Sequence, residues 1–319
     1  FGSEGSTVGA HMTIVHRGLS AADPLSNTQV RNAFTTGVDT RLRFGGRAYE
    51  ATGNIGVTVL EGEPAGIERT QRASTHYLQR VDQPTIRFDP TPTTLGGSQI
   101  QGSISKISGR HWLWNSTMMT EWPEFDPPDF GRLNYAGDFM NSNRLTYRET
   151  RPGRIFRAYS FQGGVNNYFY FDTDLGVRKT ITSNESFTWK NFWVTSVSFS
   201  RFLRGLDAQA TRGGPAMGIP RGWNLNASLR NSSGAKTAWS GGWFIRTNEL
   251  GSRSWDVNGS LSARPSPSVQ LSVEPEYLNE KGTNAFFSGP IGPQYLTTVN
   301  GGRPESFGKR YVFGLVDRT

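Results

Sequence analysis

The sequence predicts an all-β fold, an antiparallel up-and-down transmembrane β-barrel with about 14 visible strands. Three observations predict it: apolar residues recur at every second position, the segments with this period are long, and short connections alternate with long ones. Successive side chains of a strand point to opposite faces, so each such segment has one apolar and one polar face. Strands of about ten residues cross a bilayer at a tilt, whereas strands of soluble proteins average about five or six.

The composition excludes several other classes of protein. The 319 residues include 38 glycines and no cysteine, and the formal net charge is +8. Without cysteine there is no disulfide scaffold, zinc ribbon or thiol chemistry. The chain contains no run of about 18 apolar residues, so no transmembrane helix is predicted. The apolar content is too high for a disordered chain. Glycine has no three-residue period, so the chain is not collagen-like.

The clearest period-two patterns lie at 49–59, 223–230 and 255–262, with apolar residues at odd positions and polar residues at even positions. Charged residues inside such patterns suit a wet barrel interior. The lumen-facing candidates are therefore Asp39, Arg41, Arg43, Glu50, Asn54, Asn224, Asn226, Arg230, Asp256 and Asn258. We expect strands at 6–16, 36–44, 47–60, 98–107, 111–121, 138–149, 154–171, 177–189, 192–203, 222–230, 236–247, 253–263, 268–279 and 309–317.

The predicted connections differ in length from one end of the sheet to the other, which is typical of outer-membrane barrels. Tight turns are predicted at Gly45–Gly46, 108–110, 151–153, 190–191, 231–234 and 265–267, and long loops at 17–36, 61–97, 122–137, 204–221 and 280–308. A short helix is expected at 66–73. Aromatic residues beside the tight turns, such as Phe44, Tyr49, Trp112, Trp114 and Phe156, suit a membrane–water interface, although cross-strand packing would also explain them.

The residues that could carry chemistry are few, and we expect no enzymatic activity, metal or cofactor. His11 and His16 lie five apart on one strand and cannot share a metal, and no Ser-His-Asp arrangement follows from spacing. Asp172 and Asp174 in 172–176 resemble part of a calcium loop, but a solvated turn explains them better. Arg212 to Gly214 could present an arginine to an anionic ligand. The alternative is a turn with positive φ at glycine whose arginine pairs with an inward acid.

Four segments, taken in their order along the chain, resemble one family of unknown activity. They are 88–97 with 105–109, 125–138 ending in Gly-Arg-Leu-Asn-Tyr-Ala-Gly-Asp, 211–217 and 310–317. Together they resemble the outer-membrane barrel region called domain of unknown function 5916, over most of the chain. The resemblance implies a bacterial outer-membrane location and no established substrate. Longer members carry an N-terminal carbohydrate-binding-type sandwich. We therefore interpret residues 1–319 as a single barrel region, a fragment without that sandwich or the last strands.

The leading hypothesis is a porin-like transport barrel at the cell surface, with its long loops facing the cell exterior. It would conduct a small or glycan-type solute, and lumen arginines such as Arg41 would favour anions. Its partners would be outer-membrane lipid, lipopolysaccharide phosphates and a protein bound at the long loops. Scattered lysines and arginines without a motif argue against nucleic acid. The alternatives are a structural scaffold or anchor with a blocked lumen, and a soluble glycan-binding module with an apolar core between two sheets.

Overall fold

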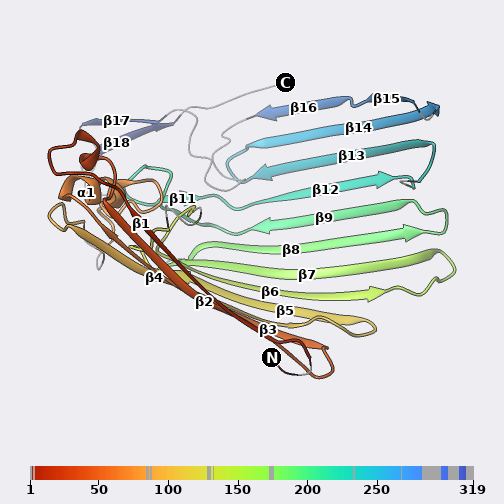
Figure 1. The fold of residues 1–319 in the computed structure, drawn as a ribbon. Helices are drawn as coiled ribbons and strands as arrows, with labels where there is room; N and C mark the ends of the chain where they lie inside the picture. The colour runs from red at the N-terminus through yellow and green to blue at the C-terminus, as the bar shows by residue number, and fades with distance from the viewer. Residues whose placement is uncertain are drawn as a thin grey trace.

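The computed structural model describes residues 2, 4–83, 86, 88–127, 131, 133–171, 176–232, 234–266, 268–281, 296–300 and 309–313. Its main feature is one antiparallel sheet of 14 strands, in which almost every strand pairs with the strands next to it in sequence (Figure 1). Its strands are β1 (Thr7–His16), β2 (Asn32–Phe44), β3 (Tyr49–Glu61), β4 (Thr94–Lys106), β5 (Trp112–Glu121), β6 (Asp138–Glu149), β7 (Phe156–Tyr170), β8 (Gly176–Trp189), β9 (Val194–Phe202), β12 (Gly222–Arg230), β13 (Thr237–Asn248), β14 (Arg253–Ser266), β15 (Val269–Val273) and β16 (Glu276–Lys281). Two small sheets pair β10 (Gly205–Asp207) with β11 (Met217–Ile219), and β17 (Leu296–Asn300) with β18 (Lys309–Phe313).

The predicted all-β, antiparallel, sequentially paired architecture is confirmed, but the predicted closure is not. β1 pairs only with β2, and β15 and β16 pair only with β14, so the two edges of the sheet do not meet within the described residues. The sheet is nevertheless curved, and its first strands pass in front of the later ones in Figure 1. Closure into a barrel therefore stays a prediction.

The end of the sheet differs from the predicted strands. The segment predicted as one strand at 268–279 is two strands, β15 and β16, which pair with different parts of β14. Proline has no N–H to donate to a ladder, and the break falls at Glu274 and Pro275. β17 lies within the predicted loop 280–308. β18 pairs with β17 rather than with the large sheet, and residues 314–317 of that predicted strand lie outside the described residues.

The tight connections lie at one end of the sheet, as predicted. Between β2 and β3 the chain turns within 45–48, where Gly45, Gly46 and Arg47 have φ of 64°, 66° and 62°. Such left-handed backbone favours glycine. The opposite end carries the longer connections 17–31, 62–93, 122–137 and 203–221, together with the short connection 249–252. Figure 1 shows these longer segments gathered at one end of the strands.

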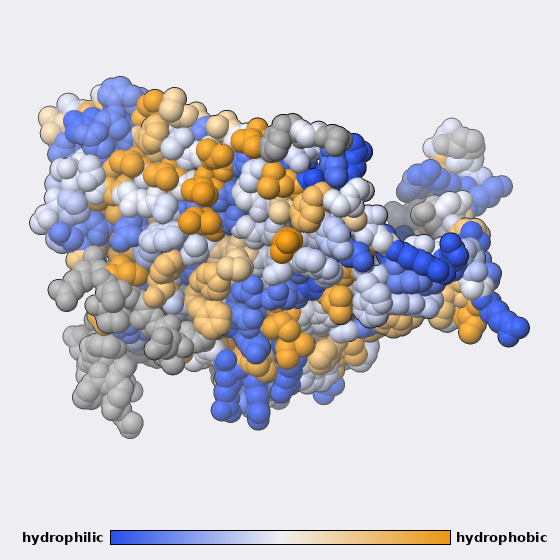
Figure 2. All heavy atoms as spheres, turned by 90° about the horizontal axis from the view of Figure 1, so that it is seen from below, coloured by the Kyte–Doolittle hydropathy of each residue, from blue (hydrophilic) through white to orange (hydrophobic). Residues whose placement is uncertain are grey.

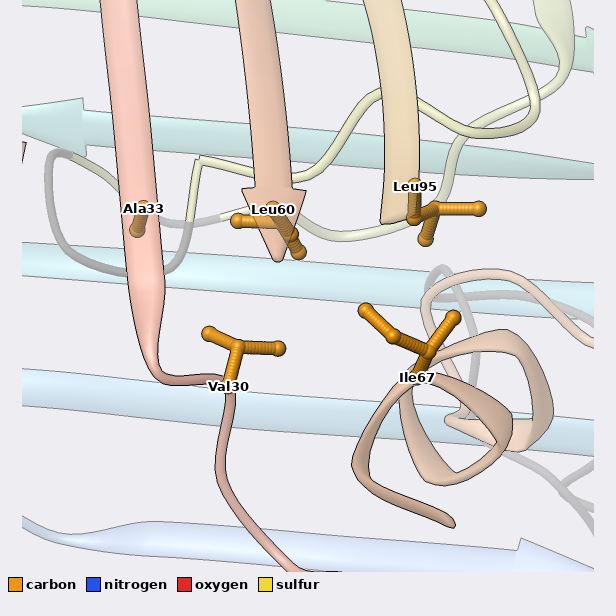
Figure 3. Packing of buried hydrophobic residues seen from close by; sticks show 5 residues of the cluster. All are labelled: Val30, Ala33, Leu60, Ile67 and Leu95. Atoms are coloured by element: carbon orange, nitrogen blue, oxygen red, sulfur yellow. The ribbon is translucent and has the colours of Figure 1, made fainter. Parts of the chain in front are cut away.

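The larger of two buried hydrophobic clusters in the described residues lies where β2, β3 and β4 meet the longer connections. There the helix α1 (Pro64–Arg72), close to the predicted 66–73, begins with proline and carries Arg69 and Arg72 in its last turn, both favourable positions. Figure 3 shows the core side chains pointing toward one another. They are Val30, Ala33, Leu60, Ile67 and Leu95.

Replacing Ile67 by alanine should lower the free energy of unfolding by about 2–5 kcal/mol, because a fully buried side chain would leave a cavity. Chemical denaturation of the purified chain measures this. A matched Ile155→Ala variant should change it by less than about 0.5 kcal/mol, because Ile155 is exposed in a turn. Equal losses in the two variants would contradict the assigned core.

Candidate functional site: the polar face and its loop cluster

All ten lumen-facing candidates lie on the same face of the sheet, here called the polar face. Directly paired residues of an antiparallel ladder point to the same side, so the register links the strands one by one. Asp39 pairs with Asn54, which pairs with Gln101 of β4. At the other side of the sheet, Asn224 pairs with Arg246. The same face continues through every strand between them.

The first part of the polar face contains a small ion-pair group on β2 and β3. The Nε atom of Arg43 donates to Oε2 of Glu50 at 3.0 Å, and Nε of Arg41 lies 3.7 Å from the same oxygen. Nearby, Nε2 of Gln99 donates to Oδ1 of Asn54 at 2.8 Å. Glu50 thus brings together two arginines that were predicted separately.

The last part of the polar face places the other candidates on β12 and β14. Asn226 pairs with Phe244, which in turn pairs with Asp256. Nδ2 of Asn258 donates to Oδ1 of Asp256 at 2.6 Å. Arg230 is exposed and pairs with Ser240 beside a tight turn.

Sequence reasoning missed the middle of the polar face, on β5 to β9. In β6, polar residues occupy both odd and even positions, so the period of two is hidden. The register nevertheless carries the face through these strands, with hydrogen bonds such as Oγ of Ser142 donating to Oδ1 of Asn166 at 2.6 Å. The uncharged members of this stretch are Asn115, Thr117, Ser142, Gln162, Asn166, Thr182, Asn184, Ser198 and Ser200.

The charges of the polar face are of both signs and nearly balance. The cations are Arg41, Arg43, Arg144, Arg148, Arg178, Arg230 and Arg246, and the anions are Asp39, Glu50, Glu121, Asp138, Asp256, Glu276 and Glu280. The sequence-based expectation of an anion-favouring interior rested on arginines alone. The acids of β5, β6 and β16 offset those arginines.

The opposite, apolar face is exposed rather than covered by a second layer. Ile14, Ile55 and Leu271 are 67%, 53% and 63% exposed. Every exposed large hydrophobic residue within a strand of the large sheet lies on this face. Figure 2 shows hydrophobic residues in patches over the body of the molecule, with hydrophilic residues between them and at its ends. Representative exposed residues of this face are Val8, Met12, Val38, Val57, Ile100, Ile104, Met118, Leu145, Phe161, Ile181, Phe199, Trp243, Val257, Leu261 and Tyr277.

Aromatic rings form a belt beside the tight turns. Phe44 stacks on Tyr49, with ring centroids 5.5 Å apart. Further along the sheet, edge-to-face contacts join three more ring pairs at 4.8–5.0 Å. These pairs are Trp112 with Tyr147, Phe156 with Trp189, and Trp193 with Trp239. The rings therefore pack across strands, as one of the two alternatives from the sequence predicts, and their place at a membrane–water interface stays a prediction.

Polar residues interrupt the apolar face on β5 to β8, and most of them bond to one another. Oγ of Ser116 donates to Oδ1 of Asn143 at 2.8 Å, and Nδ2 of Asn143 donates to Oδ1 of Asn141. Oγ of Ser183 donates to the Glu185 carboxylate. Mutual hydrogen bonds reduce the cost of placing such groups outside water.

The longer connections pack together into what we call the loop cluster, made of the described parts of 62–93, 122–137 and 203–221. Arg80, only 4% exposed, is its centre. Its guanidinium donates from Nε to Oδ1 of Asp82 at 3.1 Å and from Nη1 to the Tyr135 hydroxyl at 3.2 Å, and lies 5.1 Å from the Tyr170 ring centroid. Oδ2 of Asp82 accepts from the Ala216 N–H at 2.6 Å. One buried cation thus links all three connections.

The electrostatics of this centre follow from burial and pairing. Burial raises the pKa of the Tyr135 hydroxyl, although the neighbouring Arg80 opposes that rise. Burial alone would lower the pKa of Arg80, but Tyr135 and Asp82 raise it. Arg80 therefore stays charged, and its hydrogen bonds are of the strong, charge-assisted kind.

A second buried contact holds 122–127 against the polar face. His76 is fully buried, with Nδ1 2.7 Å from the Pro123 carbonyl oxygen and Nε2 3.2 Å from Oδ2 of Asp126. The Asp126 N–H donates to Oγ1 of Thr58, a buried residue of β3. A Cβ at Gly97 would overlap the Phe125 backbone, so glycine is required where this connection touches β4. Sequence reasoning placed His76 in a loop but gave no signal for its partners.

The loop candidates have different outcomes. Arg212 and Gly213 have φ of 52° and 93°, which confirms the expected positive-φ turn. Arg212 is exposed and forms no salt bridge with any described residue, so the expected pairing with an acid stays a prediction. The Gly214 N–H donates to the Thr211 carbonyl at 3.3 Å within the same turn. Asp172 and Asp174 lie outside the described residues.

The connection 249–252 is tied to the loop ends of β9 and β12 by one carboxylate. Glu249 accepts from Nε and Nη2 of Arg204 at 2.7 and 2.6 Å, and from the Arg221 N–H at 3.0 Å. The hydrogen bonds from Arg204 are the main cause that lowers the pKa of Glu249 to about 2.

Glu249 should therefore titrate near pH 2 rather than near its ordinary value of 4.5. Because the pKa is lowered in the folded state, the contribution of this contact to stability is complete above pH 4.5. It is then lost as the pH falls toward 2. A ¹³C NMR titration of the Glu249 carboxyl, assigned with a Glu249→Gln variant, measures this. A midpoint near 4.5 would contradict the contact.

Neither a metal centre nor a membrane-crossing helix is found in the part of the chain that the structure describes. No group of three potential metal ligands occurs there, and no helix there is long and apolar enough to cross a bilayer. His11 pairs with Gly37 and His16 with Asn32, so the two histidines point to opposite faces as predicted.

Comparisons with known proteins give one result. No curated protein and no solved structure matches the chain. A family model does match, over residues 27–297, which is most of the chain and includes all ten polar-face candidates. The chain therefore belongs to the family described as Domain of unknown function (DUF5916).

Proposed function

We propose that the chain forms the wall of a bacterial outer-membrane β-barrel, which conducts a small or glycan-type solute along its polar face. One observation carries the proposal: the exposed large hydrophobic residues of the sheet all lie on one face, and polar residues line the other. Monomeric soluble proteins rarely expose contiguous apolar patches larger than a few hundred Å². Such a face is stable in contact with hydrocarbon, where each apolar side chain stays out of water.

The strand geometry supports the same proposal. Twelve of the strands, β1–β9 and β12–β14, have nine to 15 residues, which is long enough to cross a bilayer at a tilt. Backbone polar groups must be satisfied inside hydrocarbon, and strand pairing does this everywhere except at the two edges. We infer that the edges formed by β1 and by β15 with β16 are closed by pairing with each other or with further strands.

The polar face supplies the solute path in this proposal. Amides and hydroxyls dominate its middle, and such groups hydrogen-bond sugar hydroxyls and water alike. Because arginines and carboxylates of this face nearly balance, we expect weak ion selectivity rather than the anion preference that the arginines alone suggested. The longer connections face the cell exterior, and the loop cluster controls entry at that end.

A structural role is the second candidate, and the loop cluster favours it. Its buried contacts, centred on Arg80 and His76, fix three connections over one end of the polar face. A permanently fixed cluster would block the lumen. The chain would then anchor or scaffold an extracellular assembly through its long loops and carry no solute.

Two measurements test the proposal in sequence. The expressed chain should remain in the membrane fraction after an alkaline wash and require detergent for extraction. Release without detergent would contradict a barrel and favour the soluble module. Purified protein in planar bilayers should then show discrete conductance steps. Stable insertion with no conductance would reject the conduit and favour the scaffold.

A further inference from the structure

The tight-turn end of the large sheet is strongly cationic. Five of its turns, at 45–48, 107–111, 150–155, 190–193 and 231–236, contain lysine or arginine and no aspartate or glutamate. The sixth, at 267–268, contains no charged residue. We call the exposed cations of these turns the basic rim: Arg47, Arg110, Arg151, Arg154, Lys190 and Lys236.

The opposite end of the sheet has no such excess. Its connections mix both signs, with acids such as Asp23, Glu63, Asp82, Asp207 and Glu249 among the arginines. Several of these acids are paired, for example Glu249 with Arg204 at 2.6 Å. By contrast, no member of the basic rim forms a salt bridge with a described residue. Two acids adjoin the rim: Glu4 accepts from the Arg47 N–H and Glu149 from the Arg151 N–H, both at 2.8 Å. Six rim cations outnumber these two acids, so the tight-turn end keeps a net positive charge.

The basic rim adjoins the aromatic belt and the apolar face. The Trp193–Trp239 contact lies between the turns that carry Lys190 and Lys236, and the Phe156–Trp189 contact lies beside Arg154. Moving inward from this end, the exposed surface changes from cations to aromatic rings and then to aliphatic side chains. A phospholipid has the matching order of anionic phosphate, glycerol backbone and acyl chain.

We infer that the basic rim binds the phosphates of anionic glycerophospholipids in the leaflet that the tight turns face. The inference rests on the proposed membrane location, and it adds a lipid class and the residues that select it. Each cation held near an anionic lipid surface strengthens binding about fivefold at moderate salt, so six such positions suffice for marked selectivity. A soluble anionic partner would have no use for the adjoining apolar face.

Tryptophan quenching by brominated lipid tests the inference, because several tryptophans of the belt lie beside the basic rim. The chain is reconstituted in phosphatidylcholine vesicles that contain a minor share of brominated phosphatidylglycerol or of brominated phosphatidylcholine. Brominated phosphatidylglycerol should quench more strongly, and the difference should shrink as salt screens the charges.

The test variant replaces the basic rim by neutral residues. Glutamine replaces five of the cations, and asparagine replaces Arg47, whose φ of 62° asparagine tolerates. The matched control removes six cations elsewhere, most of them toward the opposite end. These are Arg69, Lys179, Arg201, Arg212, Arg253 and Lys281, none of which forms a salt bridge with a described residue.

We expect the relative affinity for phosphatidylglycerol over phosphatidylcholine to fall on the order of fivefold or more in the rim variant and to change little in the control. Equal quenching by both lipids in the unaltered chain, or an equal loss in both variants, would overturn the inference while leaving the membrane location intact. Absence of quenching by either lipid would instead reject the membrane location, and the inference with it.

Discussion

Replacing Ile100 by arginine should destabilise the membrane-inserted fold by about 2–4 kcal/mol, whereas the same change at Gln101 should cost less than about 0.5 kcal/mol. The two residues are neighbours in the middle of β4 and differ in the face they occupy. Ile100 pairs with Ile55 on the apolar face and is 44% exposed, and Gln101 pairs with Asn54 on the polar face. In the proposed barrel, an arginine at the first position would enter hydrocarbon, and at the second it would enter water.

Unfolding by denaturant of each variant reconstituted in lipid vesicles measures both free energies. The ratio of folded to unfolded chain after insertion into the vesicles gives an independent check. Both substitutions add one charge and similar volume to the same strand. The strand propensity and the size of the new arginine are therefore the same at both positions and do not affect the difference between the two free energies. Similar costs at Ile100 and Gln101 would show that the two faces meet the same environment, and the proposed wall would fail.

Replacing Arg80 by alanine should lower the free energy of unfolding by about 3–5 kcal/mol, because it leaves buried partners without their cation. Asp82 and the Tyr135 hydroxyl lose the bonds described above, and the Tyr170 ring loses its cation contact. The three connections of the loop cluster should separate, so limited proteolysis within 203–221 should become faster.

Arg69→Ala is the matched control for Arg80→Ala. Arg69 is an exposed arginine of α1 in the same connection, and its loss should change stability by less than about 0.5 kcal/mol. Equal proteolysis of both variants would contradict the role of Arg80. In planar bilayers, larger conductance in Arg80→Ala would favour the conduit, because the cluster then acts as a removable cover.

The part of the fold that the sequence predicts is the part encoded locally. The alternation in 49–59 needs only neighbouring residues to be visible, and β3 occupies Tyr49–Glu61 as expected. Glycines hide the start of β4, since Gly96 and Gly97 have low strand propensity and are kept there by contacts with other segments. In β6, polar residues on both faces remove the pattern altogether, and only pairing with β5 and β7 defines its faces.

The loop cluster could not be predicted, because its contacts join residues far apart in sequence. Arg80 and Tyr135 are 55 positions apart, and His76 and Pro123 are 47 apart. No short-range period marks such pairs, and an arginine or histidine in a loop is more often solvated than buried. The polar-face residues were predictable because alternation assigns a face, whereas the partner of each residue, such as Glu50 for both Arg41 and Arg43, follows only from the register.

The central claim is that the apolar face meets lipid and the polar face meets water, and single cysteines test it most directly because the chain has none of its own. Cysteines would replace Val57, Leu225, Val257 and Leu271 on one face, and Asn54, Asn226 and Asn258 on the other. In intact membranes, a water-soluble maleimide should label only the three asparagine positions, and a lipid-soluble one should label the four apolar positions. Labelling of the apolar positions from water, or equal labelling of both sets, would contradict the claim.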